Sequence, residues 1–290
     1  MELTQEKGQG NGPDSLPLER TGMQEILERA STGSGGELYY SLQEQEFLHL
    51  VPHLAANNFV LTGLFAVQDF ADTRGISLLT VFEKEGTCLV LVRAAGPGTA
   101  SIARIFPSAC WFERECMDGF GISFEGAFDT RRLFLHEPYP ADFHPLRKSV
   151  PNQPAPMKQA IDPKDEYPFR TVEGDGIYQV PVGPVHAGII EPGHFRFSVI
   201  GETIFNLEIR MFYKHRGIEK LAEGKRPDNC LGIAEAVSGD ESVANAVCFA
   251  LAVERISGVT VPERAWFLRT IFLEMERICS HLGDLSGMLV

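Results

Sequence analysis

The sequence predicts an α+β protein in which a small N-terminal domain precedes a mainly helical C-terminal region. Runs rich in Val, Ile, Leu and Phe recur between residues 59 and 93, with short polar turns between them, as in strands joined by hairpins. Eight prolines fall between residues 137 and 168 and mark a change of character. Beyond residue 215 the apolar residues recur at helical spacing. Helices that flank hairpin-linked strands predict a first domain built over an antiparallel sheet.

In the first domain the apolar spacing predicts a short helix over residues 22–31 and a longer one over 43–57. The expected inward face of the longer helix carries Phe47, Leu48, Val51 and Leu54. Strands are predicted at residues 59–69, 75–83 and 87–93, a brief helix or strand at 101–106, and a helix at 110–117. Glu85 and Gly86 are expected to form the turn between the last two strands.

The proline-rich stretch prevents regular hydrogen-bonded ladders and favours extended chain. We place the linker between the two parts at residues 151–175. After it, strands are predicted at residues 176–180, 195–200 and 204–213, followed by a helix start at 215–223, a long helix at 234–256 and a last helix from about 262 to 283. Thr260 is a candidate cap of that last helix, and Pro262 suits its first turn.

The charge and the N-terminus limit the classes of partner. A formal net charge of -13 argues against a nucleic-acid partner, which usually requires a basic surface. No apolar run reaches the length of a membrane span. Residues 1–30 begin without the apolar core of a secretory signal and are expected to form a disordered or weakly ordered lead. We therefore expect a cytoplasmic protein that partner subunits hold at any membrane where it acts.

The six cysteines form no Cys-x-x-Cys pair. Cys110 and Cys116 are too far apart in sequence for a zinc knuckle. We expect reduced, mostly buried thiols that behave as small apolar side chains. The sequence therefore predicts no iron–sulfur cluster bound by this chain.

A charged segment follows the first domain's strands. Its acids and bases are Glu113, Glu115, Asp118, Arg131 and Arg132. The acids lie on a predicted helix, and the two arginines are expected to pair with them. Phe120 and Phe124 would anchor the following loop. Such a knot of opposite charges predicts a structural role or a role in subunit docking.

A second group of polar residues lies among glycines and prolines between residues 183 and 220. Its members are His186, His194, Arg196, His215, Arg216 and Glu219. A neutral imidazole can donate to a quinone carbonyl or relay a proton near neutral pH. The alternative is that each imidazole satisfies buried backbone groups in an irregular loop. Arg216 and Glu219, at i and i+3 of a helix start, are typical of a surface ion pair worth about 0.2–0.5 kcal/mol.

Both segments resemble known subunits. Residues 111–115 read Trp-Phe-Glu-Arg-Glu, residues 129–132 Asp-Thr-Arg-Arg and residues 144–148 His-Pro-Leu-Arg-Lys. Their order is similar to that in the 30-kDa subunit of complex I, with Ala127 and Phe128 in place of the usual His-Pro. The second group resembles the 49-kDa quinone-pocket subunit and the large subunits of membrane-bound [NiFe] hydrogenases.

A fusion of the two is similar to the large subunits of group 4 hydrogenases of the formate hydrogenlyase and hydrogenase-4 type. The resemblance implies a 30-kDa-like scaffold domain over residues 31–150. It implies the β-hairpin and first helices of a mainly α large-subunit or 49-kDa-like domain over residues 176–290, truncated at its end.

The nickel ligands of that family are absent from the matching segment. The hydrogenases carry Cys-Gly-x-Cys-x-x-x-His, whereas Ser238, Glu241 and Asn245 occupy the ligand positions here. A hydroxyl and a carboxylate are poor substitutes for soft thiolates, so nickel is not expected. No Tyr follows Tyr213, although the complex I pocket uses one in this region. Asp240 and Glu241 form either a proton-carrying patch or a solvated helix start favoured by the helix dipole.

The resemblance implies a soluble-arm subunit of a membrane-associated oxidoreductase complex that couples electron transfer to proton movement. It would lie peripherally on the cytoplasmic face of the inner membrane, beside a small iron–sulfur subunit that holds the clusters and beside membrane ion-translocating subunits. Candidate catalytic residues are Glu219, His194 and Arg216, and quinone or proton-path candidates are His186, Arg196, His215, Asp240 and Glu241. Two alternatives stay open: a non-catalytic scaffold subunit, and a genuine hydrogenase or NADH:quinone oxidoreductase subunit.

Overall fold

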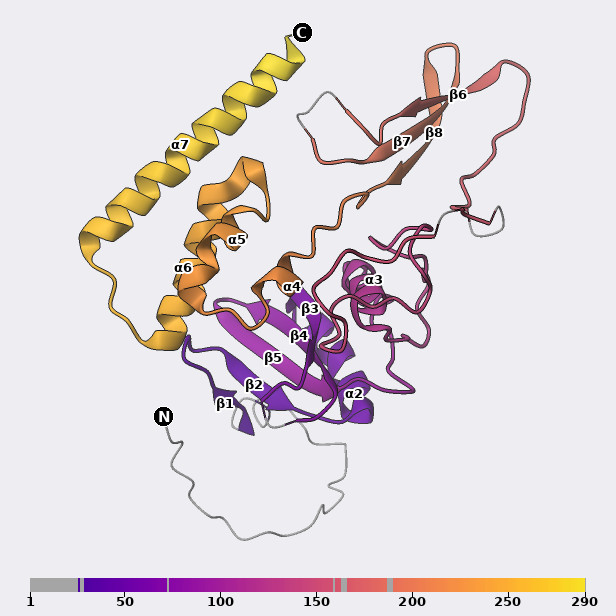
Figure 1. Ribbon diagram of the computed structural model, residues 1–290. Coiled ribbons are helices and arrows are strands. Elements are labelled where there is room, and N and C mark those ends of the chain that lie inside the picture. The colour runs from indigo at the N-terminus through magenta and orange to yellow at the C-terminus, as the bar shows by residue number, and fades with distance from the viewer. Residues whose placement is uncertain are drawn as a thin grey trace.

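The computed structural model describes residue 26 and residues 29–71, 73–158, 160–162, 166–186 and 190–289. Most of the predicted lead over residues 1–30, and most of the helix predicted over 22–31, lie outside the described residues. A five-stranded sheet with two helices lies at one end of the chain, and a three-stranded sheet lies apart from it (Figure 1). The mixed α+β class is as predicted.

The larger sheet has the strand order β1-β2-β5-β4-β3. Its strands are β1 (Ser31–Thr32), β2 (Leu38–Ser41), β3 (Val60–Gln68), β4 (Ile76–Lys84) and β5 (Thr87–Ala94). Strands β3, β4 and β5 are antiparallel neighbours, as expected. Glu85 and Gly86 both have positive φ, 50° and 80°, which suits a tight hairpin turn.

The sheet also has a parallel pair that the sequence did not predict, because β2 pairs with β5 in parallel, with Tyr39 opposite Val90. Strand β2 has only four residues. It gains its partner through a long-range pairing, for which a run this short carries no clear sequence signal.

Two helices cover one face of this sheet and bury the core. They are α2 (Glu44–Ala56) and α3 (Ala109–Phe120). Phe47, Leu54 and Phe82 are fully buried between helix and sheet, and each such side chain contributes about 1.5–3 kcal/mol. The expected inward face of α2 was wrong at Leu48, which is 42% exposed. Leu50 is buried in its place, because it lies three residues after Phe47 on the same side of the helix.

Residues 121–175 contain no helix or named strand among their described residues, as the prolines predict. The brief element expected at residues 101–106 is a series of turns. Oδ2 of Asp118 holds the following loop, because it accepts backbone N–H bonds from Leu133, Phe134 and Leu135, each 2.9 Å long. Arg132 pairs with Asp118 at 3.4 Å, as expected.

The expected partner of Arg131 was wrong. Its guanidinium pairs with Asp129 rather than with a helix acid, since Asp129 lies only two residues away on the same turn. Phe120 and Phe124 are buried, as expected of loop anchors.

The smaller sheet consists of β6 (Ile177–Val182), β7 (His194–Ile200) and β8 (Thr203–Arg210), paired antiparallel in that order. The β7–β8 hairpin turns at Gly201, which has a positive φ of 57°. Strand β8 ends at Arg210 and not at residue 213. Phe212 has a φ of 61°, a value that interrupts extended backbone and is rare for a bulky side chain.

The C-terminal region consists of short helices followed by two longer ones. They are α4 (Ile218–Ala222), the 3-10 turn η2 (Pro227–Asn229), α5 (Leu231–Glu235), the 3-10 turn η3 (Gly239–Glu241), α6 (Ser242–Ser257) and α7 (Glu263–Met288). The single helix predicted over residues 234–256 is therefore wrong. Ser238 has extended backbone, with φ −145° and ψ 127°, so the chain breaks there and a new helix begins at Ser242.

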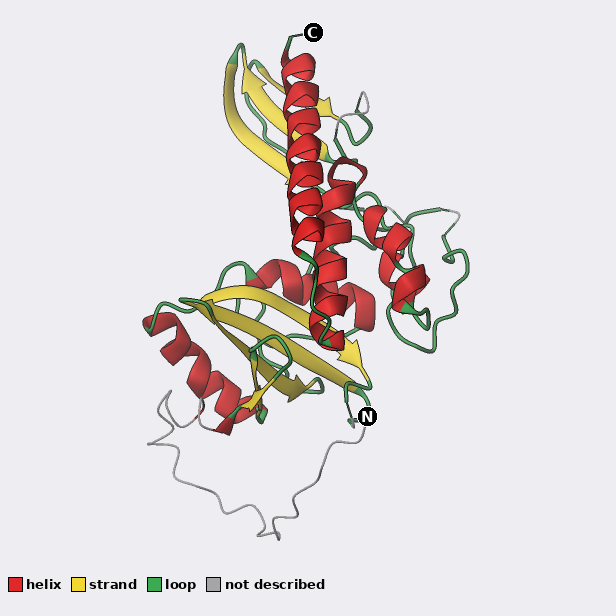
Figure 2. Cartoon of the chain, turned by 90° about the vertical axis from the view of Figure 1, so that its left-hand side faces the viewer, coloured by secondary structure: helices red, strands yellow, loops and turns green. Residues whose placement is uncertain are grey.

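Helix α7 begins above the five-stranded sheet and runs away from it to the C-terminus (Figures 1 and 2). Its N-cap is Pro262, and no side-chain cap bond is present, so the expected capping by Thr260 is wrong. No described helix has the length and apolar character of a bilayer-crossing segment. Cys248 on α6 and Cys279 on α7 are exposed, which corrects the expectation of mostly buried thiols. The cause is that neither helix has a buried face among the described residues.

Candidate functional site

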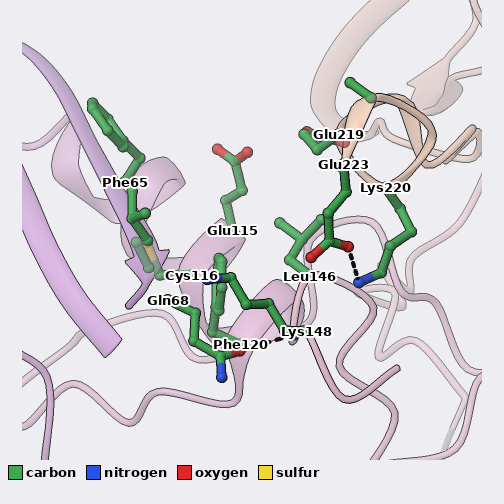
Figure 3. Close-up of a pocket in the computed structure, with 13 residues that line it drawn as sticks. Phe65, Gln68, Glu115, Cys116, Phe120, Leu146, Lys148, Glu219, Lys220 and Glu223 are labelled. Atoms are coloured by element: carbon green, nitrogen blue, oxygen red, sulfur yellow. Dashed lines mark hydrogen bonds and ion pairs between the residues drawn. The ribbon is translucent and has the colours of Figure 1, made fainter. Parts of the chain in front are cut away.

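A cavity of about 510 Å³ lies where the first domain meets the start of the helical region (Figure 3). Strand β3, helix α3, residues 146–148 and helix α4 each supply part of its wall. The apolar lining includes Phe65, Phe120 and Leu146. Glu219, a candidate from the sequence, lines this cavity from α4. The cavity therefore joins residues from both predicted parts of the chain.

A second carboxylate, Glu115 of α3, lines the same cavity and was not among the predicted site residues. Burial raises the pKa of Glu115, and the charge of Glu219 raises that pKa further. Both effects disfavour ionisation, one by desolvation and the other by repulsion between like charges. The sequence marked Glu115 as a helix acid, but only the fold brings it toward a residue about a hundred positions away.

The cations around the cavity are already engaged. Lys220 Nζ donates to the carbonyl of Arg147 at 2.9 Å and pairs with Glu223 at 2.6 Å. Lys148 Nζ pairs with Asp69 at 3.2 Å. Among the described residues, no ion pair or hydrogen bond involves the carboxyl group of Glu115 or Glu219. The two carboxylates therefore face the cavity without a neutralising partner from that part of the chain.

The buried thiol beside them is not a reactive group. Burial raises the pKa of Cys116 to about 12, so the sulfur stays protonated at neutral pH. Since the thiolate is the nucleophile and metal ligand, Cys116 serves as an apolar part of the wall.

Aromatic contacts hold the segment before α4 against the first domain. The ring centroid of Phe212 lies 5.9 Å from that of Trp111, and the ring of Tyr213 meets His136 edge-on at 4.6 Å. His215 stacks on Phe134. These contacts fix the chain immediately before α4 and so determine where Glu219 lies.

His215 is a neutral ring in this setting. Burial lowers its pKa, although Glu219 acts in the opposite direction. Its Nε2 is buried and has no hydrogen-bond partner among the described residues. The structure thus brings His215 and Glu219, two of the predicted site residues, into one neighbourhood.

The other two candidate histidines form a separate group at β7. His186 Nε2 donates to the carbonyl of Gly193 at 2.7 Å, and His194 Nδ1 donates to the carbonyl of Gly183 at 3.1 Å. Gly183 is required there, because a Cβ would lie 2.2 Å from the Gly193 oxygen. One nitrogen of each ring is therefore engaged by backbone, and no described hydrogen bond or ion pair joins these rings to Glu219.

The two candidate arginines are held in different places. Arg196 Nε donates to Gln179 Oε1 at 2.8 Å, and its guanidinium lies 5.0 Å from the centroid of the Phe169 ring. Arg216 donates to the carbonyl of Val237 and pairs with Glu191 at 3.5 Å. The ion pair expected between Arg216 and Glu219 is not formed, because α4 begins only after Gly217 in its left-handed conformation.

The segment expected from the sequence resemblance to match the hydrogenase ligands lies at the start of α6. Asp240 and Glu241 are exposed on η3. The first amides of α6 are bound by Glu276 of α7, which accepts from Val243 N at 2.6 Å and from Ala244 N at 3.0 Å. Glu276 holds the start of α6 in place. The sequence did not indicate this role, because the amides that Glu276 binds lie on another helix.

The donors in this segment do not suit a nickel–iron centre. Ser238, Glu241 and Asn245 supply a hydroxyl, a carboxylate and an amide in place of soft donors. Of the residues that the structure describes, no group of three His, Cys, Asp or Glu side chains is placed to hold a metal ion.

The comparisons with known proteins agree with this layout. Residues 41–156 match the family described as the respiratory-chain NADH dehydrogenase 30 Kd subunit. The chain is 38% identical over 204 residues to hydrogenase-4 component G of Escherichia coli (strain K12), covering 69% of this chain and 37% of that protein. It is 39% identical over 213 residues to formate hydrogenlyase subunit 5 of the same strain, covering 70% of this chain and 37% of the relative.

A fused protein of complex I is also similar. The C/D 2 subunit of the NADH-quinone oxidoreductase of Aquifex aeolicus (strain VF5) is 28% identical over 236 residues, covering 72% of this chain and 40% of the relative. Among solved structures, a chain of the membrane-bound sulfane sulfur reductase, an archaeal respiratory membrane complex, is 18% identical with a TM-score of 0.38, covering 50% of this chain and 95% of that chain.

The chain thus spans about two fifths or less of the length of these curated relatives. Residues 41–156 match the complex I 30-kDa family, and the chain is similar to the hydrogenase-4 and formate hydrogenlyase subunits and to the fused C/D subunits of NADH-quinone oxidoreductases.

Proposed function

We propose that this chain is a soluble-arm subunit of a membrane-associated oxidoreductase complex, related to group 4 hydrogenases and complex I, that couples electron transfer to proton movement. The observation that carries the proposal is the combination of two features. The chain is 38–39% identical to hydrogenase-4 and formate hydrogenlyase subunits, yet Ser238, Glu241 and Asn245 stand at the ligand positions of the hydrogenases. In this proposal the chain works without a nickel–iron centre of its own.

Glu219 is the proposed proton-handling residue. It is exposed at the cavity and can exchange protons with solvent. His215, a neutral ring beside it, is the proposed neighbour for proton relay. His186, His194 and Arg196 would serve a separate site at β7, for which a quinone is the candidate ligand.

The similarity to subunits of membrane complexes supports a proposal for the chain's surroundings. We place residues 31–150 as a scaffold domain, residues 151–175 as the linker and residues 176–290 as the N-terminal part of a large-subunit-like domain. A small iron–sulfur subunit would hold the clusters, membrane subunits would move ions, and the assembly would lie on the cytoplasmic face of the inner membrane.

The test uses the native complex that contains this chain. We expect iron in the partner subunit, no stoichiometric nickel, and no hydrogen-dependent viologen reduction. Glu219→Gln should abolish proton-coupled turnover while the complex still assembles. Glu202→Gln, a change in the exposed β7–β8 turn, is the matched control and should leave turnover unchanged. Stoichiometric nickel with hydrogen-dependent activity would contradict the proposal and support a genuine hydrogenase.

A non-catalytic scaffold is the second candidate. It is favoured by the backbone bonds of His186 and His194 and by the capping of α6 by Glu276. A scaffold would keep full turnover in the Glu219→Gln complex, so the same variant decides between the two.

A further inference from the structure

We propose that Glu115 of the N-terminal domain is a second proton-holding residue of the cavity, coupled to Glu219 across it. This inference rests on the proposed function, because it extends the proton-handling role of Glu219 to the domain described above as a scaffold. It assigns that domain a part in the proton chemistry.

The geometry places the two carboxyl groups in one compartment. Glu115 extends from α3 and Glu219 from α4, and both line the same cavity (Figure 3). Glu219 is exposed, whereas Glu115 is half-buried beside the buried Cys116. The cavity volume of about 510 Å³ leaves room for several waters between them. Water in this shared cavity would connect the exposed Glu219 to the more shielded Glu115.

The surrounding charges do not neutralise the pair. On α4, Lys220 and Glu223 pair with each other. On the segment after residue 145, Lys148 pairs with Asp69. Strand β3 contributes the neutral Gln68, and α3 contributes the protonated thiol of Cys116. Since neither carboxylate has a described cation partner, ionising one disfavours ionising the other.

The step itself is a proton transfer with no change of oxidation state. An O–H bond of one carboxyl breaks and an O–H bond of the other forms, directly or through water. The pair keeps one proton and one negative charge throughout. A raised carboxyl pKa helps a protein to keep such a proton available, and burial together with the charge of Glu219 raises the pKa of Glu115.

The experiment compares pH profiles of the native complex carrying Glu115→Gln, Glu115→Asp or Glu125→Gln. Glu125 is an exposed acid of the same domain that does not line the cavity, so its variant is the control. We expect Glu115→Gln to lower turnover about tenfold or more and to move the alkaline limb of the profile about one pH unit lower. The shift is expected because Glu115→Gln removes one of two carboxyl groups that repel each other when both are charged. Glu115→Asp keeps the charge and should retain most of the wild-type profile.

A spectroscopic readout separates proton holding from a merely structural role. Infrared titration of the complex should show a protonated carboxyl band that persists above the ordinary glutamate pKa, and that band should be lost in Glu115→Gln but not in Glu125→Gln. A wild-type profile and an unchanged band in Glu115→Gln would overturn the inference. If Glu219→Gln still abolishes turnover in that case, the proposed function stands. If Glu219→Gln also leaves turnover unchanged, both proposals fail.

Discussion

The imidazole ring of His215 lies stacked on the phenyl ring of Phe134, with 4.4 Å between the ring centroids and an interplanar angle of 23°. Phe134 belongs to the loop that Asp118 holds by its backbone amides. His215 leads directly into α4, which carries Glu219. The stack therefore ties the segment that leads to the cavity to a firmly bonded loop of the first domain.

Because His215 is buried in this stack, we expect the protein to lose stability in acid. The pKa of His215 is lowered below its ordinary value of 6.5, so the unfolded chain binds more protons than the folded chain as the pH falls through that value. The unfolding free energy should decrease accordingly. His215→Phe keeps an aromatic ring and should reduce this acid sensitivity, with the remainder due in part to His136, whose pKa is also lowered. Thermal unfolding between pH 5 and 8, an interval chosen to bracket the ordinary His pKa of about 6.5, measures the effect. His49→Phe, at an exposed position of α2, should leave the pH dependence as in wild type.

Glu115 predicts the opposite pH dependence. Its folded-state pKa is raised above 4.5, so the folded chain binds more protons than the unfolded chain, and stability is lost as pH rises through the raised value. Glu115→Gln should therefore have a higher melting temperature than wild type at pH 8. The difference should vanish below pH 4.5, the ordinary pKa of this group. Equal melting temperatures at both pH values would show that Glu115 carries no such penalty.

We expect substitution of Asp118 to lower the unfolding free energy strongly. Asp118→Asn replaces a charged acceptor of three backbone N–H bonds and leaves Arg132 without its carboxylate. We expect a loss of about 2–4 kcal/mol in unfolding free energy, measured by urea denaturation. Asp142→Asn, at an exposed position, should change it by less than about 0.5 kcal/mol.

We expect substitution of Glu276 to destabilise the start of α6 locally. Glu276→Ala removes the acceptor of the Val243 and Ala244 amides, a loss comparable to that of an N-cap, about 0.5–2 kcal/mol. Hydrogen exchange should show faster exchange at these two amides. Glu274→Ala, on the exposed side of the same helix, is the control and should leave both amides protected as in wild type.

The local sequence pattern determined most elements of this fold. Runs rich in Val, Ile, Leu and Phe and the Glu85-Gly86 turn predicted β3, β4 and β5, because strand propensity and hairpin turns depend on nearby residues. The prolines of residues 137–168 predicted a stretch without ladders. The charged motifs of the first domain were sufficient to indicate the complex I 30-kDa family that residues 41–156 match.

Only the tertiary structure decided the features that join distant residues. The parallel pairing of β2 with β5, the break before α6 capped by Glu276, and the convergence of Glu115 with Glu219 all depend on contacts between segments far apart in sequence. Local propensity does not encode such contacts, because the chain gains their energy only when the packed elements bring the groups together. The sequence therefore supplied the chemical groups of the cavity, and the positions of α3 and α4 around it determined which of those groups line it together.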